Sequence, residues 1–259
     1  MIRRLACALL MLAAATAAAT AAHWRPPAGM TFSIILSVSP ATVNTSAQVV
    51  DLDLFETRYS TIAALKRQGK RVVCYLSAGS WENWRPDRNR FPKSVIGKNY
   101  DGWPGEKWVD IRAESVKNIM KARMDLCKLK GFDGVDADNV NGYQQDTGFR
   151  IRRADSVAFL RFLAAEAHKR GLAFGLKNTT ELARDVLPLM DFAVTEDCFG
   201  QGWCAQSRNF IAANKPVFAI EYTDNHISFP AFCQQARNLG LSPIYKKRNL
   251  DTWEKRCPP

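Results

Sequence analysis

The sequence predicts an α/β fold: a single (β/α)8 barrel of the TIM type with a degenerate first β/α unit. Short apolar runs bounded by Gly or Pro alternate with longer amphipathic segments along most of the 259 residues. Apolar runs of this length suit parallel strands that are covered on both faces. The helical segments end just before a glycine, which indicates the repeated helix–glycine–strand order of a parallel sheet.

Eight of the apolar runs are predicted strands. They are Phe32–Leu36, Val49–Leu54, Arg71–Ser77, Gly134–Asp138, Leu172–Leu176, Phe192–Glu196, Pro216–Tyr222 and Ser242–Tyr245. A doubly wound open sheet is the alternative to a barrel. The count of eight favours closure, and so does the absence of a glycine-rich phosphate loop after the first strand. The connection over residues 38–48 is too short for a full helix, so the first β/α unit is expected to be degenerate.

Three amphipathic segments have the clearest helix boundaries. They are Thr57–Gln68, Ala113–Lys130 and Asp155–Arg170, which precede Gly69, Gly131 and Gly171. A glycine directly after a helix readily adopts the left-handed conformation that ends it. We find no internal repeat and no low-complexity linker, so residues 23–259 are predicted to form one barrel domain.

The first 22 residues have the layout of a secretory signal peptide. Arg3 and Arg4 precede an apolar run over Leu5–Ala15, and small residues follow up to Ala22. This apolar run is shorter than the roughly 20 residues that a membrane-spanning helix needs. We therefore expect cleavage after Ala22 and a secreted or periplasmic, soluble, monomeric protein, with a retained N-terminal anchor as the alternative.

The chain is basic, with a formal net charge of +11, and removal of Arg3 and Arg4 with the signal peptide leaves +9. A positive charge of this size is compatible with anionic partners such as nucleic acid. The basic residues, however, are scattered along the predicted helices and do not form one run. They therefore indicate a solvated outer surface, and we expect no nucleic-acid partner.

Six cysteines remain after cleavage, an even number that permits disulfides in an exported protein. The Cys198 and Cys204 pair can close a short loop, and Cys233 with Cys257 can hold the C-terminal segment. Cys74 lies inside the apolar third strand and is expected to be a buried thiol. With no CxxC pair and no cluster of histidines, we expect no metal site and no cofactor.

Acidic residues end four of the eight predicted strands. They are Asp53, Asp138, Glu196 and Glu221. In a parallel barrel the carboxyl ends of the strands meet at one rim, where active sites are built. Solvated strand ends and helix caps are the simpler explanation for any one of them. Four at one rim favour a carboxylate pair of the kind that cleaves glycosidic bonds, one group as acid and the other as nucleophile or base.

Aromatic residues are concentrated in the loops that follow these strands. They are Trp81, Trp84, Tyr100, Trp103, Trp108, Tyr143 and Trp203. Ordinary packing explains any single tryptophan equally well. As a group, flat rings around a rim of carboxylates indicate a groove that binds a saccharide.

Motifs at the strand ends resemble glycoside hydrolase family 114, the endo-α-1,4-polygalactosaminidases. The resemblance covers nearly the whole mature chain, from about Trp24 to Tyr245, and the first of its motifs is Asp53-Leu54-Phe55. It runs through Val73-Cys74-Tyr75-Leu76-Ser77-Ala78-Gly79-Ser80-Trp81-Glu82, Gly102-Trp103-Pro104-Gly105-Glu106, Gly134-Val135-Asp136-Ala137-Asp138-Asn139-Val140, Gly175-Leu176-Lys177-Asn178, Glu196-Asp197-Cys198-Phe199 and Ile220-Glu221-Tyr222. It departs from the family at Ala137, where a Pro is common, and in the apolar Ile34-Ile35, where the family often has a Gln.

The resemblance implies a (β/α)8 barrel that hydrolyses α-1,4-linked galactosamine, an amino-sugar polysaccharide of biofilms and fungal walls. It implies that Asp138 and Glu196 are the catalytic pair. On the assumption of a retaining mechanism, we assign Asp138 as nucleophile and Glu196 as acid/base; the separation of the carboxyl groups, which distinguishes retaining from inverting enzymes, is not encoded in the sequence. Asp136, two residues earlier on the same strand face, is the rival nucleophile. The residues expected to bind substrate are Asp53, Tyr75, Asp136, Asn139, Lys177, Asn178, Glu221 and Tyr222.

A cationic galactosamine polymer and a mature chain of +9 would repel each other at long range. Charges are screened over roughly 8 Å at physiological salt, so a locally acidic cleft can dominate binding. Such a cleft is expected from Asp53, Glu56, Asp136, Asp138, Glu196, Glu221 and Asp224.

Two alternative functions use the same residues differently. A noncatalytic carbohydrate-binding barrel would keep the aromatic residues but needs no carboxylate pair. A phosphotransferase would use the Asp51-Leu52-Asp53 segment to hold Mg²⁺, although this segment lacks the expected following Thr. His168 lies within a predicted helix and is expected to be structural.

Overall fold

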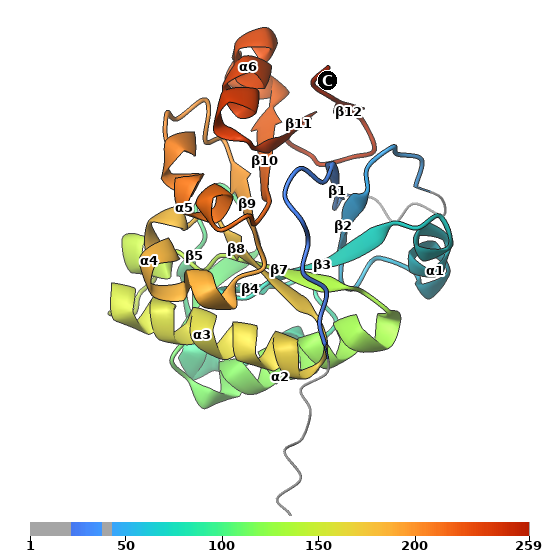
Figure 1. Ribbon diagram of the computed structural model, residues 1–259. Coiled ribbons are helices and arrows are strands. Elements are labelled where there is room, and N and C mark those ends of the chain that lie inside the picture. Colours follow the sequence, from blue (N-terminus) through green and yellow to red (C-terminus); the bar gives the residue numbers. More distant parts are fainter. Residues whose placement is uncertain (1–21, 38–42, 259) are drawn as a thin grey trace, which may run out of the picture.

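The computed structural model describes residues 22–37 and 43–258, and its centre is a parallel sheet rolled into a barrel (Figure 1). Eight parallel strands lie in the order β1-β2-β3-β7-β8-β9-β10-β11. Their bounds are β1 Phe32–Ile35, β2 Val49–Asp53, β3 Arg71–Ser77, β7 Gly134–Asp138, β8 Ala173–Lys177, β9 Phe192–Glu196, β10 Val217–Tyr222 and β11 Ser242–Lys246. This confirms the predicted barrel class and all eight predicted strands, with no boundary off by more than one residue.

Helices in the connections cover the outside of the barrel (Figure 1). They are α1 Tyr59–Arg67, α2 Glu114–Lys130, α3 Arg153–Lys169, α4 Ala183–Val186, α5 Arg208–Ala212 and α6 Phe229–Leu239. The first three match the predicted helices, and the glycine after each has a positive φ. The described part of the first connection, residues 36–37 and 43–48, contains no helix, as expected for a degenerate unit. The predicted signal peptide lies outside the described residues apart from Ala22.

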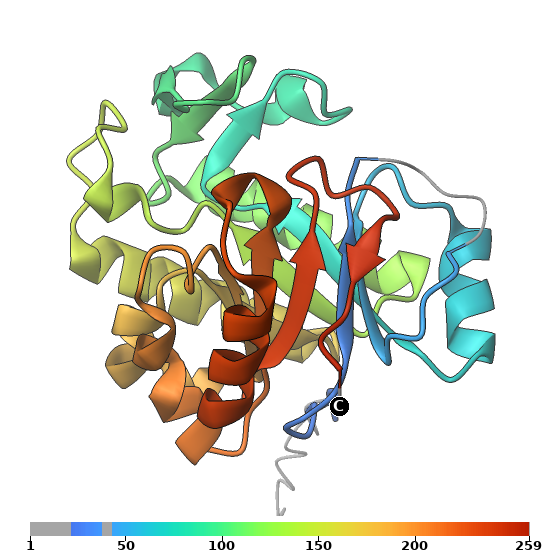
Figure 2. The same cartoon turned by 90° about the horizontal axis from the view of Figure 1, so that it is seen from above.

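The long connection between β3 and α2 folds into a small antiparallel sheet that we did not predict. Its strands are β4 Ser80–Glu82, β5 Ile96–Asn99 and β6 Glu106–Val109, in the order β4-β6-β5. In Figure 2 this teal and green segment stands beyond the arrowheads of the barrel strands. It therefore forms a wall at the end of the barrel where the strands finish.

The two edges of the barrel, β1 and β11, are joined through the C-terminal segment. Within the described residues no backbone ladder pairs β1 with β11. Instead β12, Glu254–Lys255, pairs antiparallel with β11, and the Glu254 carboxylate accepts a hydrogen bond from the Ser33 hydroxyl. The Arg256 guanidinium donates to the Phe32 carbonyl at 3.2 Å. These side chains connect β1 to the C-terminal segment at the seam between β1 and β11, where no backbone ladder joins the two strands.

The inside of the barrel changes from apolar to polar along the strands. Successive side chains point to opposite faces, so every second residue faces inward. At the amino ends the rings of Phe32 and Phe218 stack 4.4 Å apart, with Phe192 beside them. Gly175 leaves room for this packing, since a Cβ there would lie 2.2 Å from the Phe192 ring. At the carboxyl ends the inward positions are Asp53, Tyr75, Asp138, Lys177, Glu196 and Tyr222.

Between the strands and the helices lies a second apolar layer, and three disulfides between described residues lie in it or pack against it. Cys74 on β3 is bonded to Cys127 on α2, so the prediction of a buried thiol at Cys74 was wrong. Cys74 is buried as expected, but it faces the helix layer, and its partner depends on how α2 rotates against the strands. The other bonds join Cys198 to Cys204 and Cys233 to Cys257.

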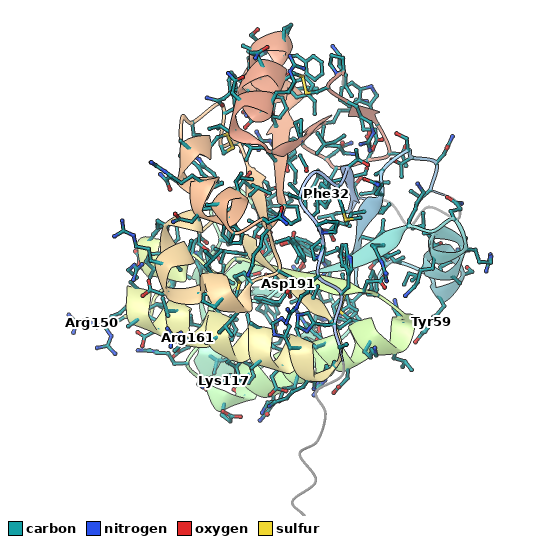
Figure 3. All side chains as sticks on the ribbon, viewed as in Figure 1. Phe32, Tyr59, Lys117, Arg150, Arg161 and Asp191 are labelled. Atoms are coloured by element: carbon teal, nitrogen blue, oxygen red, sulfur yellow. A yellow bond between two sulfur atoms is a disulfide. The ribbon has the colours of Figure 1, made fainter. Side chains whose placement is uncertain are left out.

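Basic residues of the helices and loops lie on the outer surface. Figure 3 shows Lys117, Arg150 and Arg161 on the outside of the barrel, away from its interior. This agrees with the solvated outer face expected from their scattered positions. Among the described helices, none combines the length and the apolar composition that crossing a bilayer requires.

We predict that removing the Cys74–Cys127 bond costs far more stability than removing Cys198–Cys204. The first bond closes a loop with a sequence separation of 53 residues and the second of 6. In the chain-entropy model, the double alanine variant at 74 and 127 loses about 3–4 kcal/mol of unfolding free energy. Urea denaturation measures both variants, and equal losses would contradict the expectation.

Candidate active site

A cavity of about 1050 Å³ opens at the carboxyl ends of the barrel strands. Its floor is formed by Tyr75 on β3 and by the last residues of β2, β7, β8, β9 and β10. The small β4–β6 sheet forms one wall, and the loop after β11, with Arg248 and Leu250, forms another. The rim predicted from the strand ends is therefore an open, bounded site.

The ammonium group of Lys177, the last residue of β8, lies at the centre of the floor. Its Nζ is 3.0 Å from Asp136 Oδ2, 3.9 Å from Asp138 Oδ2 and 3.4 Å from Glu196 Oε2. Burial alone would lower the pKa of Lys177, but the negative charges of Asp136, Asp138 and Glu196 raise it well above its usual value. Lys177 is therefore a permanent cation between the two predicted catalytic carboxylates.

Asp138, at the end of β7, is held by donors on both of its oxygens. The Tyr75 hydroxyl donates to Oδ2 at 2.9 Å, and the backbone N–H of Asn139 donates to Oδ1 at 2.8 Å. Burial, together with the charge of Asp138, raises the pKa of Tyr75 well above its usual value. The tyrosine thus stays protonated and orients the carboxylate.

Glu196, at the end of β9, has a parallel set of partners. The Tyr222 hydroxyl donates to Oε1, and the Asn178 amide donates to Oε2 at 3.0 Å. Asn178 also accepts from the Glu196 backbone N–H at 2.8 Å. Burial raises the pKa of Glu196, but Lys177 and these hydrogen bonds outweigh burial and lower it overall. Glu196 is therefore an anion at neutral pH.

A left-handed residue follows directly after each of the three central side chains. Asn139 has φ 62°, Asn178 φ 52° and Asp197 φ 58°, immediately after Asp138, Lys177 and Glu196. Asn and Asp tolerate this conformation better than other non-glycine residues. The chain therefore turns sharply at each strand tip, which leaves the preceding side chain on the cavity floor.

Charged residues of the small sheet and its loops complete one side of the cavity, and we did not predict them. Arg85 is buried and binds Asp53 Oδ2 at 2.7 Å and Glu82 Oε1 at 2.8 Å. The predicted binding residue Asp53 thus lines the cavity but is already paired. Only the packing of the small sheet against the strand tips brings these groups together.

Glu106, on β6, is a second acid of this wall that we did not predict as a site residue. It accepts hydrogen bonds from Ser80 and, at 2.8 Å, from the Asn139 amide. Burial, aided by the negative charges of Glu82 and Asp138, raises its pKa to about 7. Asn139 therefore links the β7 tip to the wall, and its amide is directed at Glu106 and at two buried serines.

Four of the seven predicted aromatic residues line the cavity. They are Trp84, Tyr100, Trp103 and Trp203. Trp84 is 46% exposed and Trp103 54% exposed, so these large rings are held in contact with solvent beside the floor. Trp108 is buried in packing against Tyr100, while Trp81 and Tyr143 also lie outside the cavity lining.

Two predicted binding residues lie outside the cavity. Asp136 is fully buried below Lys177, and Glu221 is fully buried and accepts from the backbone N–H groups of Phe199 and Gly200. Asp136 faces inward but lies too deep to touch a bound sugar, whereas Glu221 lies between the inward-facing Ile220 and Tyr222 on β10 and so points away from the barrel interior. Direct substrate contact by these two residues does not fit the structure. The burial of Asp136 also favours Asp138 over its rival as the reacting carboxylate.

The cavity is acidic although the chain is basic. Eight carboxylates and three basic residues line it. Of the three, Arg85 and Lys177 are buried against carboxylates, and Arg248 binds Asp197 at 2.7 Å and Asp224 at 2.9 Å. Asp224 lies outside the lining, as do Asp136 and Glu221, but the expected local excess of negative charge is present.

Among the described residues, two groups of side chains lie close enough together to hold a metal ion, and neither lines the cavity. Cys198 and Cys204, near Glu221, are joined as a disulfide. His23 and His168 stack 3.9 Å apart, and each contacts Asp191 just before β9, at the opposite end of the barrel. The two stacked rings both bind the same carboxylate, which ties the N-terminal segment to α3. This arrangement fits the structural role expected for His168.

The chain matches known proteins along nearly its whole length. The glycoside-hydrolase family GH114 matches residues 13–258. The crystal structure of Aspergillus fumigatus Ega3 in complex with galactosamine is 39% identical, with a TM-score of 0.85, over 93% of this chain and 100% of that chain. The glycoside hydrolase domain of PelA from Pseudomonas aeruginosa shares the fold at 14% identity and TM-score 0.68, over 87% of this chain and 97% of that domain.

A further relative extends the comparison to a longer protein. An uncharacterized protein of Deinococcus radiodurans is 29% identical over 205 residues, which cover 71% of this chain and 66% of that protein. The family match, the Ega3 likeness and the paired carboxylates at the barrel rim agree with one another. This chain belongs to glycoside-hydrolase family GH114.

Proposed function

We propose that this chain is a secreted, monomeric hydrolase that cleaves α-1,4-linked galactosamine polysaccharide with Asp138 and Glu196 as its catalytic pair. The main support is the position of Lys177, whose ammonium contacts both carboxylates on the floor of an open cavity. Family membership and the galactosamine bound to Ega3 support the substrate class.

In this mechanism Asp138 attacks the anomeric carbon, and Glu196 gives a proton to the leaving oxygen and later takes one from water. Tyr75 and the Asn139 N–H hold Asp138 for in-line attack. Both carboxylates remain partly accessible, at 18% and 20% exposure of their side chains. A sugar ring can therefore reach them directly.

Acid catalysis requires that Glu196 gain a proton as the substrate binds. Its pKa is lowered by Lys177 and by hydrogen bonds, although burial acts to raise it. A sugar that covers the remaining exposed surface strengthens the effect of burial, because removal of water disfavours the charged form. Substrate binding and protonation of Glu196 are thus expected to be coupled.

The separation of the carboxylates agrees with a retaining reaction. Because one nitrogen contacts both, their nearest oxygens cannot be further apart than the sum of its distances to Asp138 and Glu196. This upper limit allows the carboxyl separation of roughly 5 Å found in retaining enzymes. Of the larger separations found in inverting enzymes, it allows only the shortest.

We predict that D138N and E196Q each lower hydrolysis of defined galactosamine oligomers by about a thousandfold or more. The amides keep the size of the acids and the donors around them, so the melting temperature should stay nearly unchanged. Reducing-end release measures activity, and NMR of the first product should show a retained α anomer.

Matched controls for this experiment are D125N and E114Q. Both change acids on the exposed face of α2, and both variants should keep wild-type rates. Near-normal activity in D138N or E196Q would remove that residue from the pair. A wild-type protein that binds the oligomers but releases no reducing ends would favour the noncatalytic binding barrel.

The two roles can be separated with an activated leaving group. A substrate whose aglycone leaves without protonation should restore much of the glycosylation rate in E196Q, since only acid assistance is lost. The same substrate should not restore D138N, which lacks the nucleophile. Restoration of D138N but not of E196Q would make Glu196 the nucleophile and Asp138 the acid.

We predict that deacetylated galactosamine oligomers are cleaved at least about tenfold faster than fully acetylated ones. The excess of carboxylates in the cavity attracts the ammonium group at short range. Comparison of kcat/KM for oligomers of equal length tests this, and the difference should shrink at high salt. Equal rates for both polymers would count against recognition by charge.

A further inference from the structure

Two acids are buried together inside the barrel, one layer below the cavity floor. Asp51 on β2 and Asp136 on β7 are both fully buried, and neither lines the cavity. Their carboxyl groups lie within hydrogen-bonding reach of each other. Lys177 is 3.0 Å from Asp136 Oδ2, so Asp136 connects Asp51 to the centre of the site.

Three of the four carboxyl oxygens in this pair receive no hydrogen bond from any described residue. They are Asp51 Oδ1, Asp51 Oδ2 and Asp136 Oδ1. Ionised carboxylates are acceptors only, so two of them cannot hydrogen-bond each other. Two adjacent unpaired anions in the interior are also strongly disfavoured. A single shared proton removes both problems, because it creates one O–H donor and removes one charge.

The surroundings decide which acid holds the proton. Burial raises the pKa of Asp136, but the cation 3.0 Å from it opposes this effect and favours its charged form. Asp51 has no such contact: burial and the negative charge of Asp136 raise its pKa well above the usual value, and the more distant Lys177 only opposes this. The proton therefore belongs on Asp51.

We propose that Asp51 is a positioning residue that stays protonated and donates a hydrogen bond to Asp136. Asp136 is then a fully ionised partner that holds Lys177 from below, and Lys177 in turn lies between Asp138 and Glu196. An anionic Asp51 would instead attract the lysine toward the barrel interior. The kinetic consequence of this role rests on the proposed function, whereas the protonation of Asp51 rests on the burial, the unpaired oxygens and the charges around the two acids.

Replacement of Asp51 tests the kinetic part. D51A removes the donor, and kcat should fall about tenfold or more with KM within about twofold. Loss of this hydrogen bond also favours protonation of Asp136, so the acidic limb of the pH–kcat profile should move to higher pH. D51N supplies an N–H donor of the same size and should restore both kcat and the profile. A D51N variant as impaired as D51A would overturn the proposal.

Infrared difference spectroscopy tests protonation without any substrate. At alkaline pH, wild type minus D51N should show the C=O stretch of a protonated carboxylic acid. Wild type minus E106Q should not, because Glu106, with its pKa of about 7, is then ionised. Absence of this band from the wild type minus D51N spectrum would overturn the proposal. This test does not depend on whether D51A folds. Failure of wild type to cleave galactosamine polymers would refute the proposed function and leave this measurement intact.

Discussion

The charge of Lys177 is the constraint on which the site depends. Its ammonium is buried and contacts three carboxylates. Asp138 on β7 and Glu196 on β9 lie at the cavity floor, and Asp136 on β7 lies below it. A buried charge is tolerated only when paired and hydrogen-bonded. The contacts that stabilise the buried charge of Lys177 therefore also bring Asp138 and Glu196, from different strands, close together. The lysine balances the negative charge of both acids without any contribution from a substrate.

Around this cation the floor is built in a repeated way. Each of β7, β8 and β9 ends with a functional side chain followed by a left-handed Asn or Asp. Each of the two proposed catalytic carboxylates is held by one tyrosine from a neighbouring strand and by one amide donor. Backbone conformations of this kind are costly and persist where the surrounding structure enforces them. Here the reciprocal Asn178–Glu196 hydrogen bonds and the Asn139–Glu106 contact provide that enforcement.

Much of the barrel was predictable because its signal is local and periodic. Apolar runs bounded by glycine located strands such as Gly134–Asp138 to the residue, and strand ends located the rim. Depth along a strand was not predictable: Asp136 and Asp138 share a face, yet one lies beneath Lys177 and the other is open to solvent. The small sheet was missed because β5 and β6 are short and polar. The Cys74–Cys127 pairing was missed because it depends on how a helix packs against its strand.

The seam between β1 and β11 affects how the chain reaches its native state. Strands β1 and β2 are synthesised first, but the Ser33 hydroxyl and the Phe32 carbonyl receive their partners only from Glu254 and Arg256. Contacts between such distant positions form slowly, since a very long loop has to close. Until residues 254–256 have reached their places, the folding sheet has an unprotected edge at β1, where a chaperone or an aggregation partner can bind.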